Sequence, residues 1–410
     1  MERALNRLMS KVGADGPYWA LWFACLLGAA FKFHCGGVWI GAEQYTTGCY
    51  SDVVPFWGQR GVAAGEVPYL QARMEYPVLT GALIWLEGGI ARVAGDSAFA
   101  FLRVATAVNA MLALLILVMM RRAGVGLGRQ YGWALAPSLV LYLGHNWDLL
   151  AIAFAVSALF AAARLHERRA VVLAALGGAA KLFPLLLLPL VGLAALRREG
   201  WARALALPAV ALLAWGAVNL PIALAAPERW AEFYTFSSQR PGTAASWWEL
   251  AMQFGWLTTY VPTRNLWALI LFAGGAATII AAGWNRHAER PWLLFTPVLA
   301  WFLLTNKVWS PQFDLWLWPF AILTVSRPRP LVLFALGDLL AYFAEFWLFA
   351  GLDGAYPSAT QGDILAAASV RTAAMLWIIH ASVRDPAPEW TLTPPRAASP
   401  PPEGQPTPAG

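Results

Sequence analysis

Long apolar segments alternate with short basic clusters along most of the chain. Helical stretches of spanning length are predicted near residues 17–40, 98–120, 204–225, 264–283, 331–350 and 364–383, and shorter ones near 131–145, 148–163, 291–305 and 312–325. A helix that crosses the hydrocarbon core of a bilayer needs about 20 mostly apolar residues. The pattern therefore predicts an all-α, polytopic membrane protein.

Composition and charge support this class. The chain has 410 residues, of which 59% are hydrophobic and 13% charged, whereas soluble domains are about one quarter charged. The net charge of +6 comes from clusters between apolar segments, a distribution that orients membrane helices. We therefore expect membrane lipids as partners and no nucleic acid. We also expect 17–40 to be a span and not a cleaved signal peptide.

The basic clusters predict the topology. Arg3, Arg7 and Lys11 precede the first segment, and later clusters lie near residues 121–129, 164–169, 197–203, 286–290 and 326–330. If all are cytoplasmic, the chain crosses about twelve times and both termini are cytoplasmic.

Two segments need a special arrangement to keep this alternation. Residues 76–94 contain Glu87 and Arg92, and charges at a helix centre cost about 2.5–3.5 kcal/mol each. We expect 76–94 to lie at the outer interface, within a large external loop over 41–97 that carries interfacial helices. Residues 170–196, interrupted by Lys181 and Pro184, are expected to form a hairpin of two short helices with its tip outward.

The remaining composition suggests one domain and a bacterial source. Residues 1–385 are predicted to form a single transmembrane domain, and 386–410, with nine prolines, a disordered cytoplasmic tail. Only four of the 29 basic residues are lysines, a bias typical of GC-rich bacterial genomes, so we expect a bacterial plasma membrane. Cys35 and Cys49 could pair on an oxidising outer face, but we predict unpaired cysteines. Their spacing does not suggest a metal site.

The polar residues that interrupt apolar sequence gather at one predicted face. Ionisable residues at membrane depth are functional candidates by default. With this topology, the candidates at the outer face are Asp52, Arg60, Glu75, His145, Asn146, Asp148, Lys181, Lys307 and Gln312.

Several candidates also have a purely structural explanation. Asp52 and Asp148 could cap the helices that follow them, and Lys181 could reach the outer headgroups. His145 could be an ordinary loop residue, and Glu75 could fix a turn before Tyr-Pro. Lys307 has the stronger functional case, because it lies in a turn with Trp and Pro in a protein that otherwise uses Arg. An acid with several cations suits a phosphate group and a hydroxyl that must lose its proton.

Several motifs occur in an order that resembles a known family. They are YSDVVPFWGQRGVAAGEVPY (50–69), MEYPVLTG (74–81), NWDLLAIAFA (146–155), AAKLFPLLLLP (179–189) and NKVWSPQFDLWLWP (306–319). Together they resemble the polyprenol-phosphate-mannose-dependent α-mannosyltransferases of glycosyltransferase family 87, within the GT-C superfamily. The resemblance extends from about residue 17 to 383. It implies a GT-C fold whose active site faces outward and whose external-loop carboxylate, at Asp52, is the general base.

The resemblance also suggests substrates and roles for the other residues. The protein would transfer a hexose, mannose in this family, from a polyprenyl-phosphate donor to a lipid or glycolipid acceptor with inversion, without cofactor or metal. Arg60, Lys181 and Lys307 would bind the donor phosphate. Glu75, His145, Asn146, Asp148 and Gln312 would bind sugar or acceptor. Two alternatives are a transferase of another polyprenyl-phosphate sugar, such as arabinofuranose, and a glycolipid transporter or flippase.

Overall fold

The computed structural model describes residue 13 and residues 15–391, and this part of the chain is helical throughout, with no strand. Five helices are long and apolar enough to cross a membrane: α6 (Ala98–Arg122), α12 (Trp201–Ala225), α15 (Val261–His287), α18 (Pro328–Leu352) and α19 (Gln361–Arg384). The sequence prediction of an all-α membrane protein is confirmed. The number of about twelve crossings stays a prediction.

The other predicted spans are shorter or broken. They are α2 (Gly16–Phe33), α7 (Leu127–Ala134), α8 (Pro137–Tyr142), α9 (Asp148–Ala163), α10 (Glu167–Gly178), α11 (Leu187–Glu199), α16 (Phe295–Thr305) and α17 (Asp314–Thr324). Short 3₁₀ turns precede three of them, at Phe183–Leu186, Pro291–Leu294 and Pro311–Phe313. Each turn contains a proline near its start, and proline favours the first turn of a helix because it lacks an N–H group.

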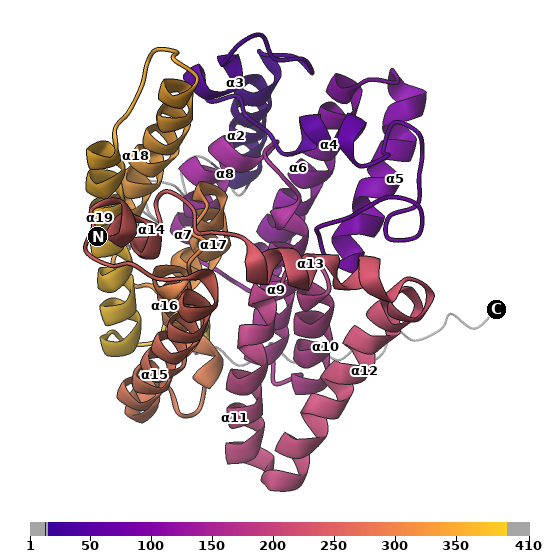
Figure 1. Cartoon of the computed structure of the whole chain (residues 1–410). Helices are drawn as coiled ribbons and strands as arrows, with labels where there is room; N and C mark the ends of the chain where they lie inside the picture. Colours follow the sequence, from indigo (N-terminus) through magenta and orange to yellow (C-terminus); the bar gives the residue numbers. More distant parts are fainter. Residues whose placement is uncertain (1–12, 14, 392–410) are drawn as a thin grey trace, which may run out of the picture.

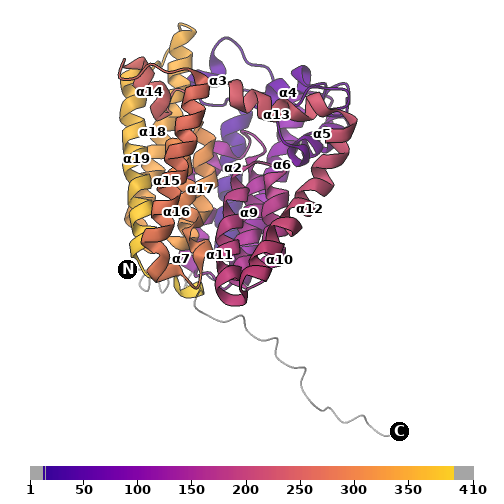
Figure 2. The ribbon, with the colours of Figure 1, turned by 60° about the horizontal axis from the view of Figure 1, so that its bottom comes forward.

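The predicted basic clusters meet at one end of the helical body. Ion pairs link Arg121 to Asp15, Arg198 to Glu167, Arg197 to Glu289 and Arg327 to Asp385. This is the lower end in Figure 2, where α7, α10 and α11 terminate. The clusters that sequence analysis placed on one side of the membrane therefore lie on one side of the protein.

The first residues of the predicted proline-rich tail belong to this basic end. The indole N–H of Trp390 donates to the carbonyl of Leu323 at 2.8 Å, and its ring packs against Phe160 and Trp292. A 3₁₀ turn covers Glu389–Thr391. The tail therefore packs against the helical body up to Thr391, and residues 392–410 lie outside the described part.

The opposite end carries the short helices of the connecting segments. These are α3 (Glu43–Thr46), α4 (Val53–Gln59), α5 (Val78–Ala94), α13 (Pro227–Gln239) and α14 (Trp247–Gln253). Figure 2 shows them around the upper end of the bundle, and Figure 1 shows α3, α4 and α5 in the upper part of the view. Three of them, α3, α4 and α5, belong to the segment 41–97 that was expected to carry interfacial helices. Near the start of α5, the N–H of Leu79 donates to the carbonyl of Ala179 at 2.9 Å.

The hairpin predicted for 170–196 is confirmed as two short helices, α10 and α11, joined by a turn at residues 179–182. The backbone N–H of Lys181 donates to Gly177, which closes the end of α10. The turn therefore places the side chain of Lys181 at the tip of the hairpin, beside the start of α5.

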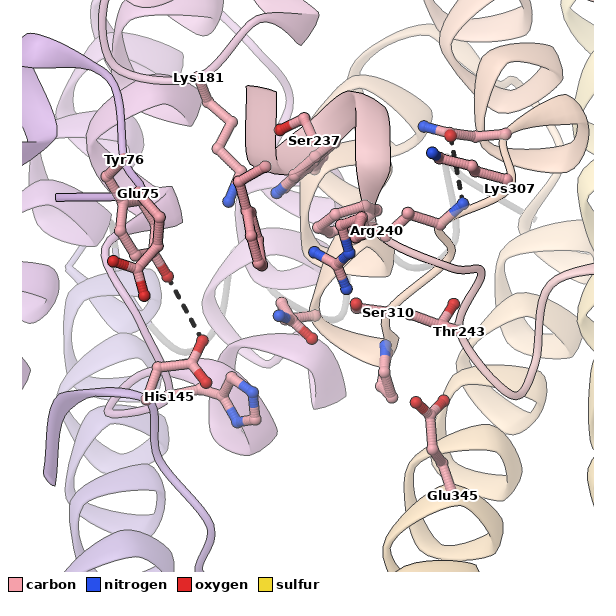
Figure 3. Close-up of a pocket in the computed structure, with 18 of the residues that line it drawn as sticks. Glu75, Tyr76, His145, Lys181, Ser237, Arg240, Thr243, Lys307, Ser310 and Glu345 are labelled. Carbon is pink, nitrogen blue, oxygen red and sulfur yellow. Dashed lines mark hydrogen bonds between the residues drawn. The ribbon is translucent and has the colours of Figure 1, made fainter. Parts of the chain in front are cut away.

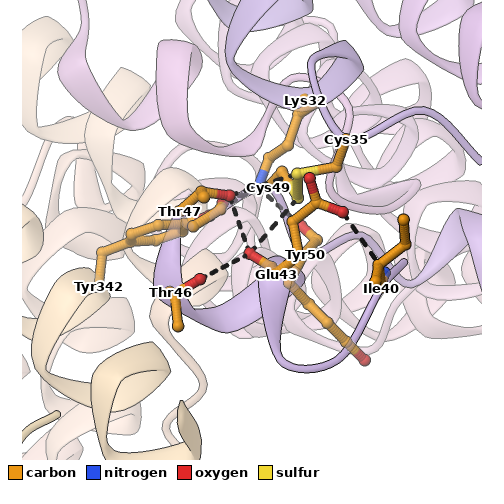
Figure 4. The surroundings of a disulfide bond; sticks show 10 residues. Lys32, Cys35, Ile40, Glu43, Thr46, Thr47, Cys49, Tyr50 and Tyr342 are labelled. Atoms are coloured by element: carbon orange, nitrogen blue, oxygen red, sulfur yellow. Dashed lines mark hydrogen bonds between the residues drawn. A yellow bond between two sulfur atoms is a disulfide. The ribbon is translucent and has the colours of Figure 1, made fainter. Parts of the chain in front are cut away.

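The prediction of unpaired cysteines is wrong for two of the three. Cys35 and Cys49 form a disulfide, whereas Cys25 is free. The chain reverses after α2 and passes through α3, which brings two residues 14 positions apart to a Cα–Cα distance of 6.3 Å, within the range that a disulfide can bridge. Figure 4 shows the bond beside Lys32 and Tyr50.

Removal of this disulfide should destabilise the protein. Replacing Cys35 and Cys49 with Ala should lower the free energy of unfolding by about 3 kcal/mol, because a loop of this length gains that much chain entropy when opened in the unfolded state. Chemical unfolding of the detergent-solubilised protein measures the change, with Cys25→Ala as the matched control. Alkylation of both Cys35 and Cys49 without reductant would contradict the pairing.

Candidate active site

A cavity of about 580 Å³ opens between the loop that carries Asp52, the tip of the α10–α11 hairpin, the C-terminal part of α13 and the C-terminal half of α18. Figure 3 shows Glu75, Tyr76 and His145 on one side, Lys307 and Glu345 on the other, and Arg240 between them. Of the predicted site residues, six line this cavity: Asp52, Glu75, His145, Lys181, Lys307 and Gln312. These six residues come from five separate stretches of sequence, which therefore meet here.

Asp52 precedes α4, but its side chain does not cap that helix. Instead, its carboxylate accepts hydrogen bonds from the hydroxyl groups of Tyr50 at 3.0 Å and Tyr76 at 3.4 Å. Burial raises the pKa of Asp52, and the two tyrosines and the Lys181 ammonium counteract part of this rise. The residue is thus a carboxylate of increased basicity facing a cavity, which is what a general base requires.

Lys32 fixes the position of the loop before Asp52. The ammonium of Lys32, fully buried, donates to the carbonyls of Tyr50 at 2.7 Å and Gly48 at 3.2 Å and to the hydroxyl of Tyr342 at 2.6 Å. On the other side, the N–H of Asp52 donates to the carbonyl of His145 at 2.8 Å. The backbone around Asp52 is therefore held by three other segments.

Lys181 lines the cavity but is already paired. Its ammonium lies 2.8 Å from Asp148, which also accepts a hydrogen bond from the Trp316 indole at 2.7 Å. The same ammonium lies 5.0 Å from the ring centroid of Tyr76 and 5.5 Å from that of Phe313. Because Asp148 neutralises most of its charge, Lys181 has less electrostatic attraction left for a phosphate.

Asp148 and Asn146 do not line the cavity, contrary to expectation. The Asn146 side-chain oxygen accepts the backbone N–H of Asp148 at 3.0 Å, and the Asn146 carbonyl accepts from the Asn109 amide at 2.7 Å. Both residues are buried. Their visible role is to build the turn between α8 and α9 and to orient Lys181.

Arg60 is a third predicted residue that does not line the cavity. It forms a bidentate pair with Glu75, with both nitrogen–oxygen distances at 2.6 Å. Glu75 does line the cavity, so Arg60 balances the charge of Glu75 from outside the cavity. Sequence analysis placed both residues in the external loop but could not show that they pair.

His145 and Gln312 also line the cavity. Burial, together with the nearby ammonium groups of Lys32 and Lys181, lowers the pKa of His145 well below its usual value. The ring is therefore neutral at pH 7 and can serve as a hydrogen-bonding group but not as a cation.

The unpaired cations of the cavity are Arg240 and Lys307. Among the residues that the structure describes, neither forms an ion pair with a carboxylate. The Lys307 ammonium donates to the carbonyl of Ser238 at 2.9 Å. Burial, and to a lesser extent the positive charges of Arg264 and Arg240, lower the pKa of Lys307 to about 8. Two close cations without an acidic partner form a site that an anion would stabilise.

Sequence analysis missed Arg240 and Glu345 as site residues. Arg240 follows α13, and only the folded chain shows that this residue faces the cavity. Glu345 could have been found, because it interrupts the apolar segment 331–350, and the rule applied to the other intramembrane charges applies equally to it.

One group of side chains has the proximity of a metal site, namely His34, Cys35 and Cys49. Because both cysteines belong to the disulfide, neither offers a thiolate ligand. Within the described residues no further group of three such side chains comes together.

Comparisons with known proteins give a likeness to a solved structure. No family model matches the sequence, and no curated protein matches it. Among solved structures, the fold is similar to the apo form of the oligosaccharyltransferase from Archaeoglobus fulgidus, with 11% sequence identity and a TM-score of 0.36. The match covers 92% of this chain and 57% of that chain, so the present protein spans little more than half the length of that enzyme. Neither family nor function follows from a likeness of this degree.

The Lys181–Asp148 pair should be essential for stability. Lys181→Met leaves the Asp148 carboxylate buried without a cation, which should lower the free energy of unfolding by about 3–5 kcal/mol. The measurement is thermal and chemical unfolding in detergent, with Arg73→Met as the control, because Arg73 belongs to an exposed pair with Glu232 that should contribute less than about 1 kcal/mol.

A second substitution separates the charge effect from the loss of packing. Adding Asp148→Asn to Lys181→Met should recover part of the stability, since it removes the unpaired charge. If Lys181→Met were no more destabilising than Arg73→Met, the pair would not have the structural importance assigned to it.

Proposed function

We propose that this protein is a membrane glycosyltransferase of the GT-C type. It transfers a hexose, mannose by the family resemblance, from a polyprenyl-phosphate donor to a lipid or glycolipid acceptor, with inversion at the anomeric carbon. The observation that carries the proposal is the arrangement of one cavity: a basic carboxylate, Asp52, faces a wall on which Arg240 and Lys307 have no acidic partner.

The proposed reaction needs one base and one anion site. The Asp52 carboxylate takes the proton of an acceptor hydroxyl as its oxygen forms a bond to the anomeric carbon. The bond between that carbon and the phosphate oxygen breaks on the opposite face, and polyprenyl phosphate leaves with the electron pair. Because Arg240 and Lys307 stabilise the negative charge that develops on the phosphate, the leaving group needs no general acid.

The other cavity residues are assigned to the sugars. Glu75, His145 and Gln312 offer hydrogen-bonding groups to hydroxyls. Lys181 faces the cavity beside Asp52 and adds positive potential there, although Asp148 compensates its charge. Arg60, Asn146 and Asp148 are assigned supporting roles through Glu75 and Lys181.

We further propose that the protein lies in a bacterial plasma membrane, with both termini cytoplasmic and the cavity at the outer face. Two features support this orientation. The basic clusters meet at the end opposite the cavity, as expected for cytoplasmic loops. The Cys35–Cys49 disulfide lies near the cavity, and disulfides persist in oxidising compartments.

Asp52→Asn should lower the transfer rate by about two to four orders of magnitude, because an amide cannot take the proton of the acceptor. The measurement is mass analysis of products after incubation with polyprenyl-phosphate mannose and a panel of glycolipids. Asp96→Asn is the matched control, since Asp96 is exposed on the same external segment and Asn tolerates its positive φ.

Donor binding should persist in Asp52→Asn, which separates loss of the base from loss of the fold. Transfer by this variant at a rate close to wild type would refute the role of Asp52. An unmodified donor across the whole acceptor panel, with folded wild-type protein, would refute the mannosyltransferase assignment itself.

The pH dependence should report Lys307. In the free enzyme, activity measured as kcat/KM for the donor should decline above pH 8, because Lys307, whose pKa is about 8, loses the charge that attracts the phosphate. On the acid side, kcat/KM should decline as Asp52 becomes protonated, at a pH above the usual range of an aspartate.

Lys307→Arg should remove the alkaline decline, since arginine stays charged throughout this range. Lys307→Met should raise the donor KM below pH 8, where the wild-type lysine is charged. The pH profile of kcat/KM from pH 4 to 10 tests both variants against wild type. An unchanged alkaline limb in Lys307→Arg would exclude Lys307 as its source.

A further inference from the structure

One face of α18 forms a wall of the cavity. Tyr342, Glu345, Phe346 and Phe349 have the spacing of neighbours on one side of a helix, and the last three line the cavity. Tyr342, one turn before Phe346, bonds to the Lys32 ammonium. The position of this wall is thus fixed to the same cation that supports the loop of Asp52.

The wall is aromatic except for Glu345. The ring of Phe346 lies 5.4 Å from that of Tyr50 and stacks at 17° against Tyr45, and Phe349 lies 5.5 Å from Tyr45. Tyr50 continues this surface to Asp52 through the 3.0 Å hydrogen bond from its hydroxyl. An apolar ring surface therefore extends from Glu345 to the proposed base.

Glu345 is a buried carboxylate without a direct partner. Glu345 is only 4% exposed, and its Oε2 atom has no hydrogen-bond partner. Arg240 and Arg371 are close enough to influence it electrostatically, but among residues 15–391 neither forms an ion pair with it. A buried acceptor left without a donor is costly, and the cavity is the side from which a donor can come.

We propose that Glu345 and the aromatic wall of Tyr45, Phe346 and Phe349 form a subsite that binds a sugar ring of the glycosyl acceptor. The rings offer an apolar surface to the C–H face of the sugar, and the carboxylate, which only accepts hydrogen bonds, selects a hydroxyl group as its partner. This inference rests on the proposed function and narrows it: the acceptor is a glycolipid with a sugar in its head group, not a simple lipid alcohol.

The charged side chains of the cavity favour the donor phosphate at one wall and the acceptor sugar at another. Arg240 lies near both Asp52 and Glu345. Each of these carboxylates acts to raise the pKa of Arg240, whereas burial lowers it. A donor phosphate bound by Arg240 and Lys307 would be repelled by Glu345 if it moved towards α18. An uncharged sugar stacked on the aromatic wall meets no such repulsion, and from there a hydroxyl can approach Asp52.

The test compares Glu345→Gln with wild type, using polyprenyl-phosphate mannose as donor and two acceptors, a mannosyl glycolipid and diacylglycerol. The substitution preserves the shape of the side chain but removes its charge. The KM for the glycolipid should rise about 10–100-fold, the usual loss for a hydrogen bond to a charged group, while the donor KM should change less than twofold. Glu228→Gln is the matched control, because Glu228 is exposed on α13 and should leave both constants unchanged.

A second variant keeps the test decisive if Glu345→Gln folds poorly. Phe349→Leu removes one ring of the wall without a change of charge, and it should likewise raise the glycolipid KM and leave the donor KM unchanged. A change in the donor KM of Glu345→Gln, with the glycolipid KM unaltered, would show that Glu345 serves only to balance Arg240 and would overturn the subsite.

The outcomes for the subsite and for the proposed function are distinguishable. Equal transfer to diacylglycerol and to the glycolipid would overturn the subsite while the transferase function stands. If no donor is consumed at all, the transferase function fails. Glycolipid binding to the subsite is then measured by titrating wild type and Glu345→Gln with the glycolipid, with tryptophan fluorescence as the readout. Equal binding by both proteins would overturn the subsite independently.

Discussion

The buried ammonium group of Lys32 joins three of the segments that build the cavity. It lies on α2, bonds to two carbonyls of the loop before Asp52, contacts Tyr342 on α18, and lies 3.5 Å from the ring of His145. A buried cation without acceptors would be very costly, so each of these segments must stay where its oxygen or nitrogen atom reaches Lys32. The disulfide at Cys35 and Cys49 closes the same stretch of chain covalently. Rigidity of the proposed base therefore comes from a residue that does not face the cavity.

Charge pairing decides which cations remain free for a substrate. Lys181, Arg60 and Lys307 were all assigned to the donor phosphate, since all three are basic residues at the predicted outer face. In the structure, Asp148 pairs with Lys181 and Glu75 with Arg60, whereas Lys307 has only a carbonyl. The unpaired cation next to Lys307 is Arg240, which no local pattern distinguishes from other arginines. The anion site thus follows from the absence, among the described residues, of an ion pair at Arg240 or Lys307. This is a property of the folded chain.

Sequence analysis predicted the helical membrane class, the gathering of the basic clusters, the α10–α11 hairpin and six of the residues that line the cavity. The helical class is confirmed, whereas the roles of the six residues stay predictions. These residues could be selected from the sequence because a charge inside an apolar segment has few permitted positions. The roles of Asn146 and Asp148 were not visible, because Asp148 meets a lysine 33 positions away. The cysteine pairing was missed for a similar reason: it depends on the reversal of the chain through α3, and hydrophobic periodicity does not report such a turn.

The cavity lies where helices are interrupted, and this placement has a physical reason. Non-helical backbone at membrane depth is tolerated only if protein buries it or if it borders a polar cavity. The long helices α12 and α15 contribute few buried residues, whereas every residue of the short helix α17 is buried. The breaks at the 3₁₀ turns that begin at residues 183, 291 and 311 shorten the inner helices. Two of these three breaks bring Lys181 and Gln312 to the cavity. The long helices α12 and α15 therefore lie at the surface of this protein, and the proline-containing breaks of the inner helices supply part of its chemistry.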